Sequence, residues 1–421
     1  MSKEKRRVPR LRFPGFTGDW EQRKLGDIST KVTTKNVDVH YTETLTNSAE
    51  QGIISQVDFF DKEISNKDNI NGYYIVENND FIYNPRISTL APVGPINRNK
   101  LNRTGIMSPL YTVFRAYKVD LGFLEWYFQS NHWHRYMKLN GDSGARADRI
   151  AIKDSTFFEM PIKTPVNIKE QVLIGETLEK FNQYITLHQR KLNHLILKKK
   201  SLLQKLFPKN GDRYPELRFP GFTDAWEQRK LGDTHTFFTD GNYSNDYPTA
   251  NEMSDSINGV PFLRGSNLDN GAINLMDVHY ITKQKHNLLT SGHTKFDDII
   301  IAVRGSLGNC GYVAKQFIDI NINSQLAIIR TDKNELSGLF LIEYLLSYLG
   351  KKEINRNITG TALKQLPINS LKMINVKYPS INEQEKISIL LSKLNTSITL
   401  HQRKLDHLQL QKKALLQQLF V

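Results

Sequence analysis

A long patterned segment occurs twice in this sequence and constrains what the chain can fold into. Residues 185–207, ITLHQRKLNHLILKKKSLLQKLF, return at 398–420 as ITLHQRKLDHLQLQKKALLQQLF, with five positions changed. Around each copy, mainly apolar residues step alternately by four and three, which is the a/d seam of a heptad repeat. The first seam runs through Ile174, Leu178, Phe181, Ile185, His188, Leu192, Leu195, Lys199, Leu202 and Leu206, and the second through Ile387, Leu391, Leu394, Ile398, His401, Leu405, Leu408, Lys412, Leu415 and Leu419.

Both copies are free of helix breakers over an unusual length. No proline and at most one glycine lie between the Glu-Gln pair that opens each copy (Glu170-Gln171 and Glu383-Gln384) and the phenylalanine that ends it. The pattern therefore predicts two helices of roughly 37 residues, each about 55 Å long. Two matched seams in one chain most simply pack on each other, so we expect an intramolecular antiparallel coiled coil.

A second repeat stands at the front of each half. LRFPGFTGDWEQRKLGD at 11–27 and LRFPGFTDAWEQRKLGD at 217–233 differ at two positions. The Phe-Pro-Gly-Phe part predicts a turn with aromatic anchors, and the Trp-Glu-Gln-Arg-Lys-Leu-Gly part predicts a short strand or helical turn. Each half thus runs from this leading motif through a globular region to a long helix, and Pro208 to Asp212 form the linker.

The two middle regions, about 28–165 and 234–379, hardly resemble each other. Each holds short β-branched and aromatic runs, such as Asp80–Tyr83 and Asp298–Val303, which predict strands of a mixed α/β domain. One short amphipathic helix is expected in each, at Phe123–Lys138 and at Phe340–Asn355. Because the ends are nearly identical and the middles diverge, we interpret the helices and leading motifs as a repeated frame and the middles as readers of different targets.

Composition indicates the kind of partner and the cellular compartment to expect. The chain of 421 residues has a formal charge of +14, which favours a polyanionic partner such as nucleic acid. Its one cysteine, Cys310, excludes a disulfide framework and indicates a reducing cytoplasm. The basic N-terminal residues are followed by no apolar core of a signal peptide, and no apolar run approaches bilayer length.

Familiar catalytic patterns are missing from the sequence. It has no P-loop, no acidic-x-Lys half of a nuclease site, and no glycine-rich loop that would hold a methyl donor. Asn84-Pro85-Arg86 lacks the second proline and the aromatic of an amino-methyltransferase motif. His132-x-His134 has no Glu or Cys at metal-ligand spacing, so a structural or surface role is predicted, and Cys310 is interpreted as a passive thiol. We expect no metal, no cofactor and no catalysis by the chain itself.

Four polar residues occupy seam positions of the predicted helices. They are expected to set the register and the antiparallel direction of the pair, as polar core residues of coiled coils do: His188, Lys199, His401 and Lys412. The lysine run at 198–200 fits either a solvated face or a binding patch.

The whole arrangement resembles the specificity subunit of Type I restriction-modification enzymes. The resemblance rests on the duplicated chain, the leading motifs, and the Pro-preceded helix start Ile168-Lys169-Glu170-Gln171, which the second copy varies to Ile381-Asn382-Glu383-Gln384. It implies that each globular region is a target recognition domain for one half of a bipartite site in double-stranded DNA. It also implies docking of two methyltransferase subunits on the helices, with motor/nuclease subunits completing the complex and the cofactors belonging to those partners.

The predicted fold class is α+β, with two mixed α/β recognition domains joined by two long antiparallel helices in a pseudo-twofold repeat. Residues 1–165 would form the first domain with its leading motif, 166–208 the first spacer helix, 209–379 the linker, second motif and second domain, and 380–421 the second helix. A spacer of about 55 Å would span roughly sixteen base pairs, enough for two short half-sites with an unread gap.

Phosphate contacts are expected from Lys and Arg, and base contacts from Arg, Asn, Gln, Ser and Thr on loops. In the first domain we predict DNA contacts from residues that cluster around glycine-containing or polar loops: Arg86, Ser88, Arg98, Lys100, Arg103, Arg146 and Arg149. In the second domain the corresponding set is Arg264, Arg304, Ser306, Asn323, Gln325, Thr361 and Lys364.

Two other classes of function compete with this hypothesis. A non-catalytic coiled-coil scaffold could use its basic charge to bind RNA or an acidic protein, but a scaffold would not require two divergent middle regions. A self-contained nuclease or methyltransferase would need the catalytic motifs that the sequence lacks.

Overall fold

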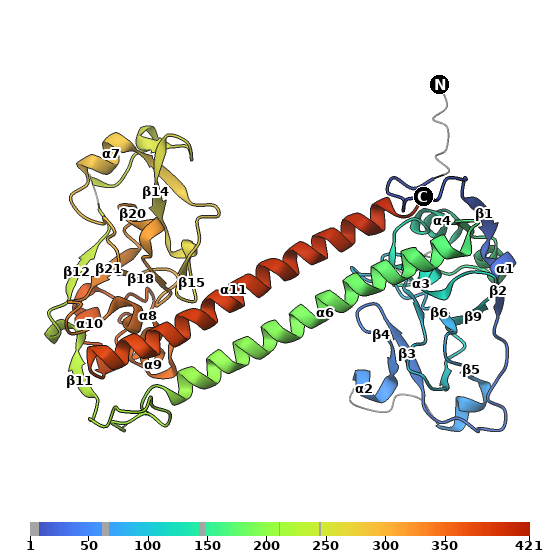
Figure 1. Ribbon diagram of the computed structural model, residues 1–421, viewed down its shortest axis with the longest axis horizontal. Coiled ribbons are helices and arrows are strands. Elements are labelled where there is room, and N and C mark those ends of the chain that lie inside the picture. Colours follow the sequence, from blue (N-terminus) through green and yellow to red (C-terminus); the bar gives the residue numbers. More distant parts are fainter. Residues whose placement is uncertain (1–7, 61–66, 143–147, 210, 244–245) are drawn as a thin grey trace. The chain divides into compact units, whose positions relative to one another are not determined.

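The computed structural model describes residues 8–60, 67–142, 148–209, 211–243 and 246–421 (Figure 1). The chain divides into two compact units. Unit 1 comprises Met1–Gln189 with Gln402–Val421, and unit 2 comprises Arg190–His401. Each unit therefore holds one globular region together with a part of both long helices. Within the described ranges, no helix combines the length and the apolar character needed to cross a membrane.

The two long helices are α6 (Ile168–Lys205) and α11 (Ile381–Gln418), each a continuous helix of 38 residues. Their length agrees with the heptad pattern and the absence of internal proline. Seam residues are buried where the helices meet the globular regions, for example Ile174, Leu178, Ile387 and Leu391, all at most 1% exposed. Because the boundary between the units falls within both helices, each helix begins in one unit and ends in the other.

Unit 1 is built on a four-stranded antiparallel sheet in the order β2-β9-β6-β7. Its aromatic core is formed by the sheet and helices α3 to α5, and it also takes in Ile174 and Leu178 of α6 and Leu419 and Phe420 after α11. The elements of unit 1 are β1 (Glu21–Lys24), α1 (Leu25–Ile28), β2 (Ser29–Lys31), β3 (Leu45–Ser48), β4 (Gly52–Ser55), α2 (Gln56–Phe60), η1 (Lys67–Gly72), β5 (Tyr74–Val76), β6 (Phe81–Tyr83), β7 (Ile96–Arg98), β8 (Gly105–Met107), β9 (Thr112–Ala116), α3 (Leu121–Gln129), α4 (His134–Asn140), α5 (Asp154–Phe158) and β10 (Pro161–Thr164).

Unit 2 has a sheet of the same kind, in the order β12-β21-β18-β19, and a second sheet β13-β17-β14-β20 in which β14 and β20 are parallel. Its main core also holds Leu206 and Phe207, which follow α6. Its elements are β11 (Glu227–Lys230), η2 (Leu231–Asp233), β12 (Phe237–Asp240), η4 (Ala250–Glu252), β13 (Met253–Ser254), β14 (Gly259–Leu263), η5 (Gly265–Asn267), β15 (Leu268–Asp269), β16 (Ala272–Ile273), β17 (His279–Thr282), α7 (Lys283–Leu288), β18 (Ile299–Ala302), β19 (Cys310–Tyr312), η6 (Lys315–Phe317), β20 (Asn321–Ile322), β21 (Leu326–Arg330), α8 (Gly338–Leu346), α9 (Tyr348–Arg356), α10 (Ile368–Lys372) and β22 (Asn375–Tyr378).

The central sheets of the two units share more than their strand order. In unit 1 the fully buried Asp80 precedes β6 and accepts a hydrogen bond of 2.7 Å from Nε of Arg115 on β9. In unit 2, Asp298 precedes β18 and receives Arg330 Nε from β21 at 2.7 Å. A buried carboxylate requires such a partner. The middle regions therefore have a common skeleton, which was only faintly visible in their sequences.

The leading motif connects to the start of a long helix through a buried ion pair. Arg12 binds Glu170 with both ends of its guanidinium, Nε to Oε1 at 2.8 Å and Nη2 to Oε2 at 2.9 Å, and Trp20 Nε1 donates to the same carboxylate at 3.3 Å. In unit 2, Arg218 binds Glu383 in the same bidentate way, at 2.8 Å for each bond. This contact explains why the glutamate opens both helices.

The glutamine beside each glutamate joins the helix to the globular region. Gln171 accepts from the backbone N–H of Asp120 at 2.8 Å and donates to the Pro165 carbonyl at 2.8 Å. Gln384 accepts from Ser337 N–H at 3.0 Å and donates to the carbonyl of Pro379 at 2.9 Å. One side chain thus satisfies backbone groups on both sides of the helix start.

Each leading motif also binds the C-terminal end of the long helix that ends in its own unit. Leu11 N–H donates to the Gln418 carbonyl of α11 at 3.0 Å, and Leu217 N–H donates to the Lys205 carbonyl of α6 at 2.8 Å. These bonds satisfy carbonyls that a helix leaves unpaired at its C-terminus. The Pro-Gly turn that follows places Gly15 and Gly221 at φ +90°, a backbone conformation that glycine adopts without steric cost. The Glu-Gln-Arg-Lys segment then forms a strand in both copies, followed by a helical turn.

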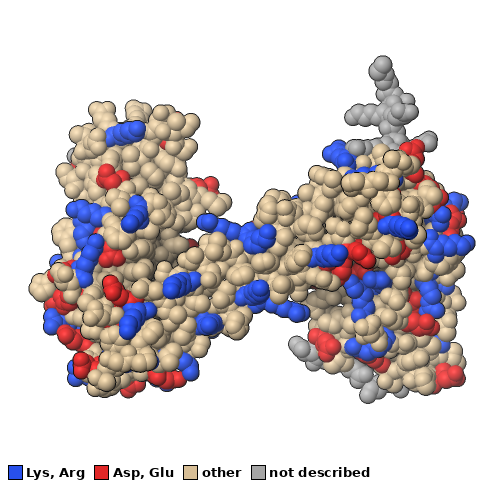
Figure 2. Space-filling view, viewed as in Figure 1, with Lys and Arg blue, Asp and Glu red and all other residues tan. Residues whose placement is uncertain are grey.

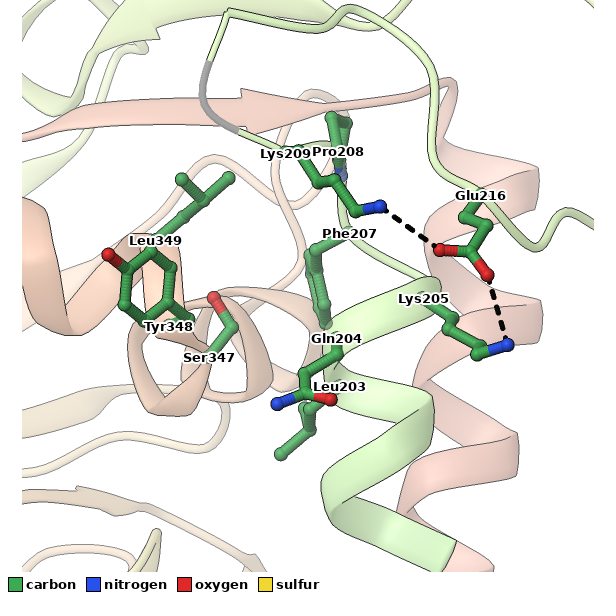
Figure 3. Close-up of a pocket in the computed structure, with 10 residues that line it drawn as sticks. All are labelled: Leu203, Gln204, Lys205, Phe207, Pro208, Lys209, Glu216, Ser347, Tyr348 and Leu349. Carbon is green, nitrogen blue, oxygen red and sulfur yellow. Dashed lines mark ion pairs between the residues drawn. The ribbon is translucent and has the colours of Figure 1, made fainter.

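Each long helix is followed by a phenylalanine that is buried in the aromatic core of the unit in which the helix ends. Phe207 lies 5.6 Å from Phe340 and 6.0 Å from Trp226, measured between ring centroids. Figure 3 shows Phe207 at the end of α6, where it lines a hollow of about 330 Å³. Glu216, which also lines the hollow, forms ion pairs with Lys205 and Lys209. Phe420 occupies the same place in unit 1, 5.4 Å from Phe123 and 5.8 Å from Tyr127.

The prediction of one amphipathic helix at 123–138 and one at 340–355 is wrong in one respect. Each segment forms two helices, α3 and α4 in unit 1 and α8 and α9 in unit 2. In unit 1 the break follows α3 at Ser130, whose hydroxyl donates to the Tyr127 carbonyl at 2.5 Å. In unit 2 the break is Ser347, whose side chain accepts from Gly350 N–H at 3.3 Å and caps α9. Serine side chains that bind nearby backbone groups compete with helix continuation, which the apolar periodicity did not reveal.

Candidate nucleic-acid interface

In unit 1, the loop after β6 is held by local hydrogen bonds that leave its arginine exposed. Asn84 Oδ1 accepts from Arg86 N–H at 3.0 Å, and Asn84 Nδ2 donates to the Asn47 carbonyl at 2.9 Å. A neighbouring loop is attached by Ile150 N–H, which donates to the Pro85 carbonyl at 2.9 Å. The side chain of Arg86 is 67% exposed, and its Nε lies 3.6 Å from the exposed carboxylate of Asp148. The loop therefore presents a charged side chain on a fixed backbone.

A surface hollow of about 360 Å³ opens beside this loop and brings together three of the seven residues predicted for the first domain: Arg86, Ser88 and Arg149. Its wall also contains the exposed apolar side chains Phe59 and Leu110. Guanidinium, hydroxyl and apolar groups are the kinds that contact phosphates, base edges and base faces. The hollow is therefore the strongest candidate for a nucleic-acid contact in unit 1.

The other predicted residues of the first domain are placed differently. Arg98 forms an ion pair with Glu125 at 2.6 Å in which both side chains are largely buried, and Lys100 reaches Glu125 and Glu179. Arg103 makes a bidentate pair with Glu43. Arg98 and Lys100 line a separate hollow against α6. The structure thus does not bring these three to Arg86, and Arg146 lies outside the described residues.

In unit 2, the loop after β18 occupies the equivalent place. The Gln325 carbonyl accepts from Val303 N–H at 2.8 Å and from Arg304 N–H at 3.2 Å. Leu366 N–H donates to the Val303 carbonyl at 3.0 Å, as Ile150 does to Pro85 in unit 1. This bond places the loop that carries Thr361 and Lys364 next to the Arg304 loop.

Exposed side chains of unit 2 collect on these two loops and on the turn between β20 and β21. Arg304, Ser306, Gln325, Thr361 and Lys364 are all exposed. The guanidinium of Arg304 stands 5.1 Å from the ring centroid of Tyr243, which is a cation–π distance. The structure therefore brings five of the seven residues predicted for the second domain onto neighbouring loops.

Of the remaining two predicted residues of unit 2, Asn323 supports these loops and Arg264 is bound elsewhere. Asn323 is 3% exposed, and its Oδ1 accepts from Gln325 N–H at 3.0 Å, which fixes the backbone that Arg304 binds. Arg264 Nη2 donates to the Asp277 carbonyl at 2.7 Å. Tyr243 of unit 2 and Phe59 of unit 1 are candidates that the sequence reasoning missed. No local pattern singles them out, because their partners are far away in the chain.

Two of the four polar seam residues, Lys199 and Lys412, contact the globular region of their own unit. Lys199 lies 3.6 Å from Glu343, which is 2% exposed. Lys412 donates to Asn182 Oδ1 at 2.8 Å and lies 4.6 Å from the centroid of the Trp126 ring, and burial lowers the pKa of Lys412. His188 and His401 are half-buried. The two lysines thus fasten the helices to the globular regions in addition to any role in helix register.

The three groups for which the sequence context predicted no catalytic role are at least half-buried: Cys310, His132 and His134. Cys310 is buried, and burial raises the pKa of its thiol to about 12. Burial lowers the pKa of both His132 and His134. A thiol with a raised pKa is a poor nucleophile near neutral pH.

Charge alone does not delimit the interface. On the visible face in Figure 2, Lys and Arg are interspersed with Asp and Glu on the globular regions, and further basic side chains lie along the helices. Many of the basic side chains are engaged in ion pairs, as Arg98 and Arg103 are. The candidate site is therefore defined by the exposed loops after β6 and β18.

Comparison with known proteins shows which family the chain resembles. A family model described as a Type I restriction modification DNA specificity domain matches residues 223–410. The chain is 26% identical over 204 residues to a putative Type I restriction enzyme MjaX specificity subunit of Methanocaldococcus jannaschii, an alignment covering 47% of this chain. The chain is thus similar to Type I restriction-modification specificity subunits. It is also 25% identical over 141 residues, 34% of its length, to the EcoBI specificity subunit of Escherichia coli.

The matched regions span less than half of these curated specificity subunits, 46% and 30% of their lengths. Solved structures extend the likeness of fold over the whole chain. The crystal structure of a Type I restriction-modification S subunit from M. genitalium aligns with a TM-score of 0.58 and 16% identity, covering 98% of this chain and 99% of that one. A chain from a study of complex assembly and conformational transition of the Type I system aligns with a TM-score of 0.50 and 16% identity, covering 97% and 98%.

Proposed function

We propose that this chain is the specificity subunit, and so the DNA-recognition component, of a Type I restriction-modification enzyme. It reads a bipartite site in double-stranded DNA, with one half-site for each globular region, and itself carries out no chemistry and holds no cofactor of the reaction. Two methyltransferase subunits dock on it, motor/nuclease subunits join in the full complex, and the complex acts on DNA in the cytoplasm.

One observation carries this proposal. The contacts that build the frame are the same in both halves, including the Arg12–Glu170 and Arg218–Glu383 pairs, whereas the exposed loops at the equivalent strand ends differ. A constant frame with variable loops is what two readers of different sequences require. Arg86 and Arg304 stand at the same position of the shared skeleton, so we assign each a base or phosphate contact in its own half-site. The remaining residues predicted from the sequence for DNA contact are secondary candidates.

We further propose that α6 and α11 form an antiparallel coiled coil that sets the spacing between the half-sites. In unit 1 the first turns of α6 share a core with the end of α11, and in unit 2 the first turns of α11 share a core with the end of α6. This is the arrangement that antiparallel helices give. The recognition domains would then be 1–165 and 209–379, with 166–208 and 380–421 as spacers.

The assignment of one half-site to each unit is tested by paired substitutions. Arg86→Ala should relax base preference or weaken binding in one half-site, and Arg304→Ala should do so in the other, each by about 1–3 kcal/mol if the lost contact is bidentate to guanine. The measurement is binding of the assembled methyltransferase to a library of sites, at fixed salt. Lys24→Ala, a change at an exposed lysine of β1, is the control that should alter neither half. An Arg86→Ala effect spread over both half-sites would contradict the assignment.

The spacer function predicts a change in the unread gap. Inserting one helical turn of four residues at facing positions in the middle of α6 and α11 should lengthen the preferred gap by about 6 Å, or about two base pairs, because a helix rises 1.5 Å per residue. Methylation sites in a host carrying the variant and its partner subunits report the gap and both half-sites together. A single-residue substitution at exposed Leu400 serves as the control. Recovery of the original gap by the longer variant would contradict the spacer role.

A further inference from the structure

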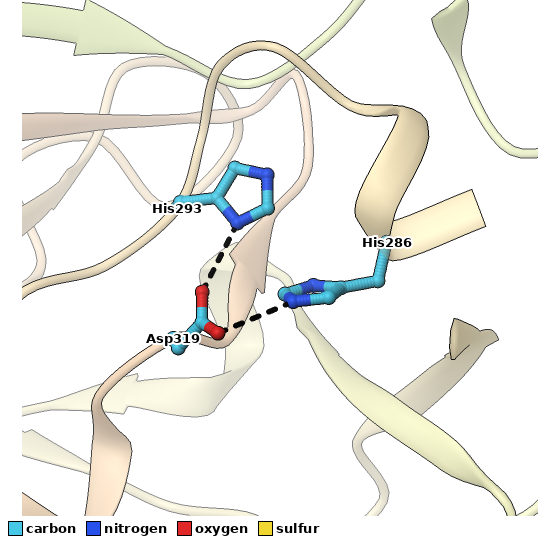
Figure 4. A group of neighbouring side chains, drawn as sticks. All are labelled: His286, His293 and Asp319. Carbon is cyan, nitrogen blue, oxygen red and sulfur yellow. Dashed lines mark hydrogen bonds and ion pairs between the residues drawn. The ribbon is translucent and has the colours of Figure 1, made fainter. Parts of the chain in front are cut away.

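Three side chains that the proposed function does not use face one another in unit 2 (Figure 4). His286 lies on α7, His293 on the loop that leads to β18, and Asp319 just before β20. His293 Nδ1 is 3.2 Å from Asp319 Oδ1, and His286 Nε2 is 3.5 Å from Asp319 Oδ2. The potential ligand atoms of all three residues lie within 4.8 Å of one another.

One ring nitrogen of His293, Nε2, already has a hydrogen-bond partner within the protein. His293 Nε2 lies 2.8 Å from the Leu289 carbonyl oxygen, which can only accept a hydrogen bond. The proton of a neutral imidazole is therefore on Nε2, and the lone pair on Nδ1 points at the carboxylate of Asp319. A lone pair and a carboxylate repel each other at 3.2 Å unless a positive charge lies between them.

His286 has the same arrangement. Its Nδ1 is hydrogen-bonded to the side-chain oxygen of Asn321, which leaves the lone pair of Nε2 directed at the other carboxylate oxygen of Asp319. The His286 side chain is 9% exposed, so carrying a proton of its own there would bury a charge. Asn321 is itself fully buried and is fixed by the parallel pairing of β14 and β20.

These distances suit a divalent transition metal. Zinc bonds of 2.0–2.2 Å to imidazole and carboxylate at tetrahedral angles separate neighbouring ligand atoms by roughly 3.3–3.5 Å. The two nitrogen–oxygen distances are close to that value. Metal-bound histidines also donate their second N–H to a carbonyl or an amide oxygen, as both histidines do here. The carboxylate is 67% exposed, so a water molecule can complete the coordination.

We propose that His286, His293 and Asp319 form a binding site for a divalent transition-metal ion, Zn²⁺ by ligand type, that fastens α7 and the following loop to β20. The ion would neutralise the repulsion between the two lone pairs and the carboxylate while both imidazoles stay neutral. The sequence pattern predicted no metal site, because the three ligands come from separate elements and have none of the short spacings that mark zinc motifs.

The test uses the full chain without a histidine tag, stripped with a chelator, at about pH 7.5, where an ordinary histidine is neutral. We expect one equivalent of Co²⁺ to give the strong visible absorption of a low-coordinate site, Zn²⁺ to displace it, and Zn²⁺ to raise the melting temperature. Asp319→Asn and His293→Ala should each weaken Zn²⁺ binding by at least about ten-fold.

Asp277→Asn is the matched control for Asp319→Asn. Both aspartates lie in unit 2 with positive φ, 56° and 60°, and asparagine tolerates this conformation equally well. Circular dichroism would verify that each variant is folded, and Asp277→Asn should keep the affinity of the unaltered chain. The proposal is overturned if the stripped chain binds no stoichiometric Co²⁺ or Zn²⁺, or if Asp319→Asn binds them as tightly as Asp277→Asn does. It is also overturned if the stability depends on pH alone and not on metal, which would show that protons occupy the cluster.

Discussion

Replacing Arg12 with alanine is expected to lower the free energy of unfolding of unit 1 by roughly 3–5 kcal/mol, the cost of leaving one partner of a buried ion pair uncompensated. The partner, Glu170, is 1% exposed, and its carboxylate would keep only the weaker bond from Trp20. The same loss is expected in unit 2 for Arg218→Ala, because Glu383 is equally buried. Urea unfolding measures the size of the loss, and hydrogen exchange shows the unit in which it occurs.

The controls separate the buried charge from general loss of packing. Replacing both Arg12 and Glu170 with leucine removes the stranded carboxylate, so the double variant should be more stable than Arg12→Ala alone. Lys24→Ala breaks an exposed pair with Glu159 and should leave the unfolding midpoint unchanged. If the double variant were as unstable as Arg12→Ala, packing and not charge would explain the loss.

Replacing Phe420 with alanine is expected to cost roughly 3–5 kcal/mol, as for other large aromatic deletions in a packed core. Phe420 is 2% exposed and contacts Phe123 and Tyr127 of α3, so its removal leaves a cavity between the helix end and the globular region. Hydrogen exchange of the last turns of α11 should accelerate together with that of α3. Phe207→Ala should produce the corresponding effect at α8 in unit 2.

Leu410→Ala on α11 is the matched control, since this leucine is 66% exposed and its removal leaves no cavity. It should leave the unfolding free energy nearly unchanged. Equal losses for Phe420→Ala and Leu410→Ala would mean that the buried aromatic ring does not anchor the helix end.

The frame of the molecule could be predicted from the sequence because its determinants are local and repeated. The heptad seam gave both long helices, and the nearly identical leading motifs marked the residues that bind them, although the roles of Arg12 and Gln171 became visible only with their partners in place. The breaks at Ser130 and Ser347 could not be predicted, because the apolar periodicity continues through them.

The candidate interface was only partly accessible to sequence reasoning. Arg86 and Arg304 could be proposed from the sequence because each follows a strand and enters a loop. Arg103 and Lys100 could not be distinguished from them, since a basic residue in a polar loop looks the same whether it pairs closely, as Arg103 does with Glu43, or loosely, as Arg86 does with Asp148 at 3.6 Å. Their partners Glu43 and Glu125 lie 60 and 25 residues away in the chain. The pairing that engages these side chains is set by the tertiary fold.

The junctions at the two helix ends have a consequence for the order of the chain. The contact of Leu217 with Lys205 is bridged by the peptide linker, whereas the same contact of Leu11 with Gln418 is held by hydrogen bonding and packing alone. The geometry of the Leu11 junction therefore does not depend on a peptide linker, and the matching geometry at Leu217 is expected not to depend on one either. A circularly permuted gene that cuts the linker and joins residue 421 to the leading motif would keep the hydrogen bonds of Leu11 to Gln418 and of Leu217 to Lys205, with the polypeptide's starting point moved.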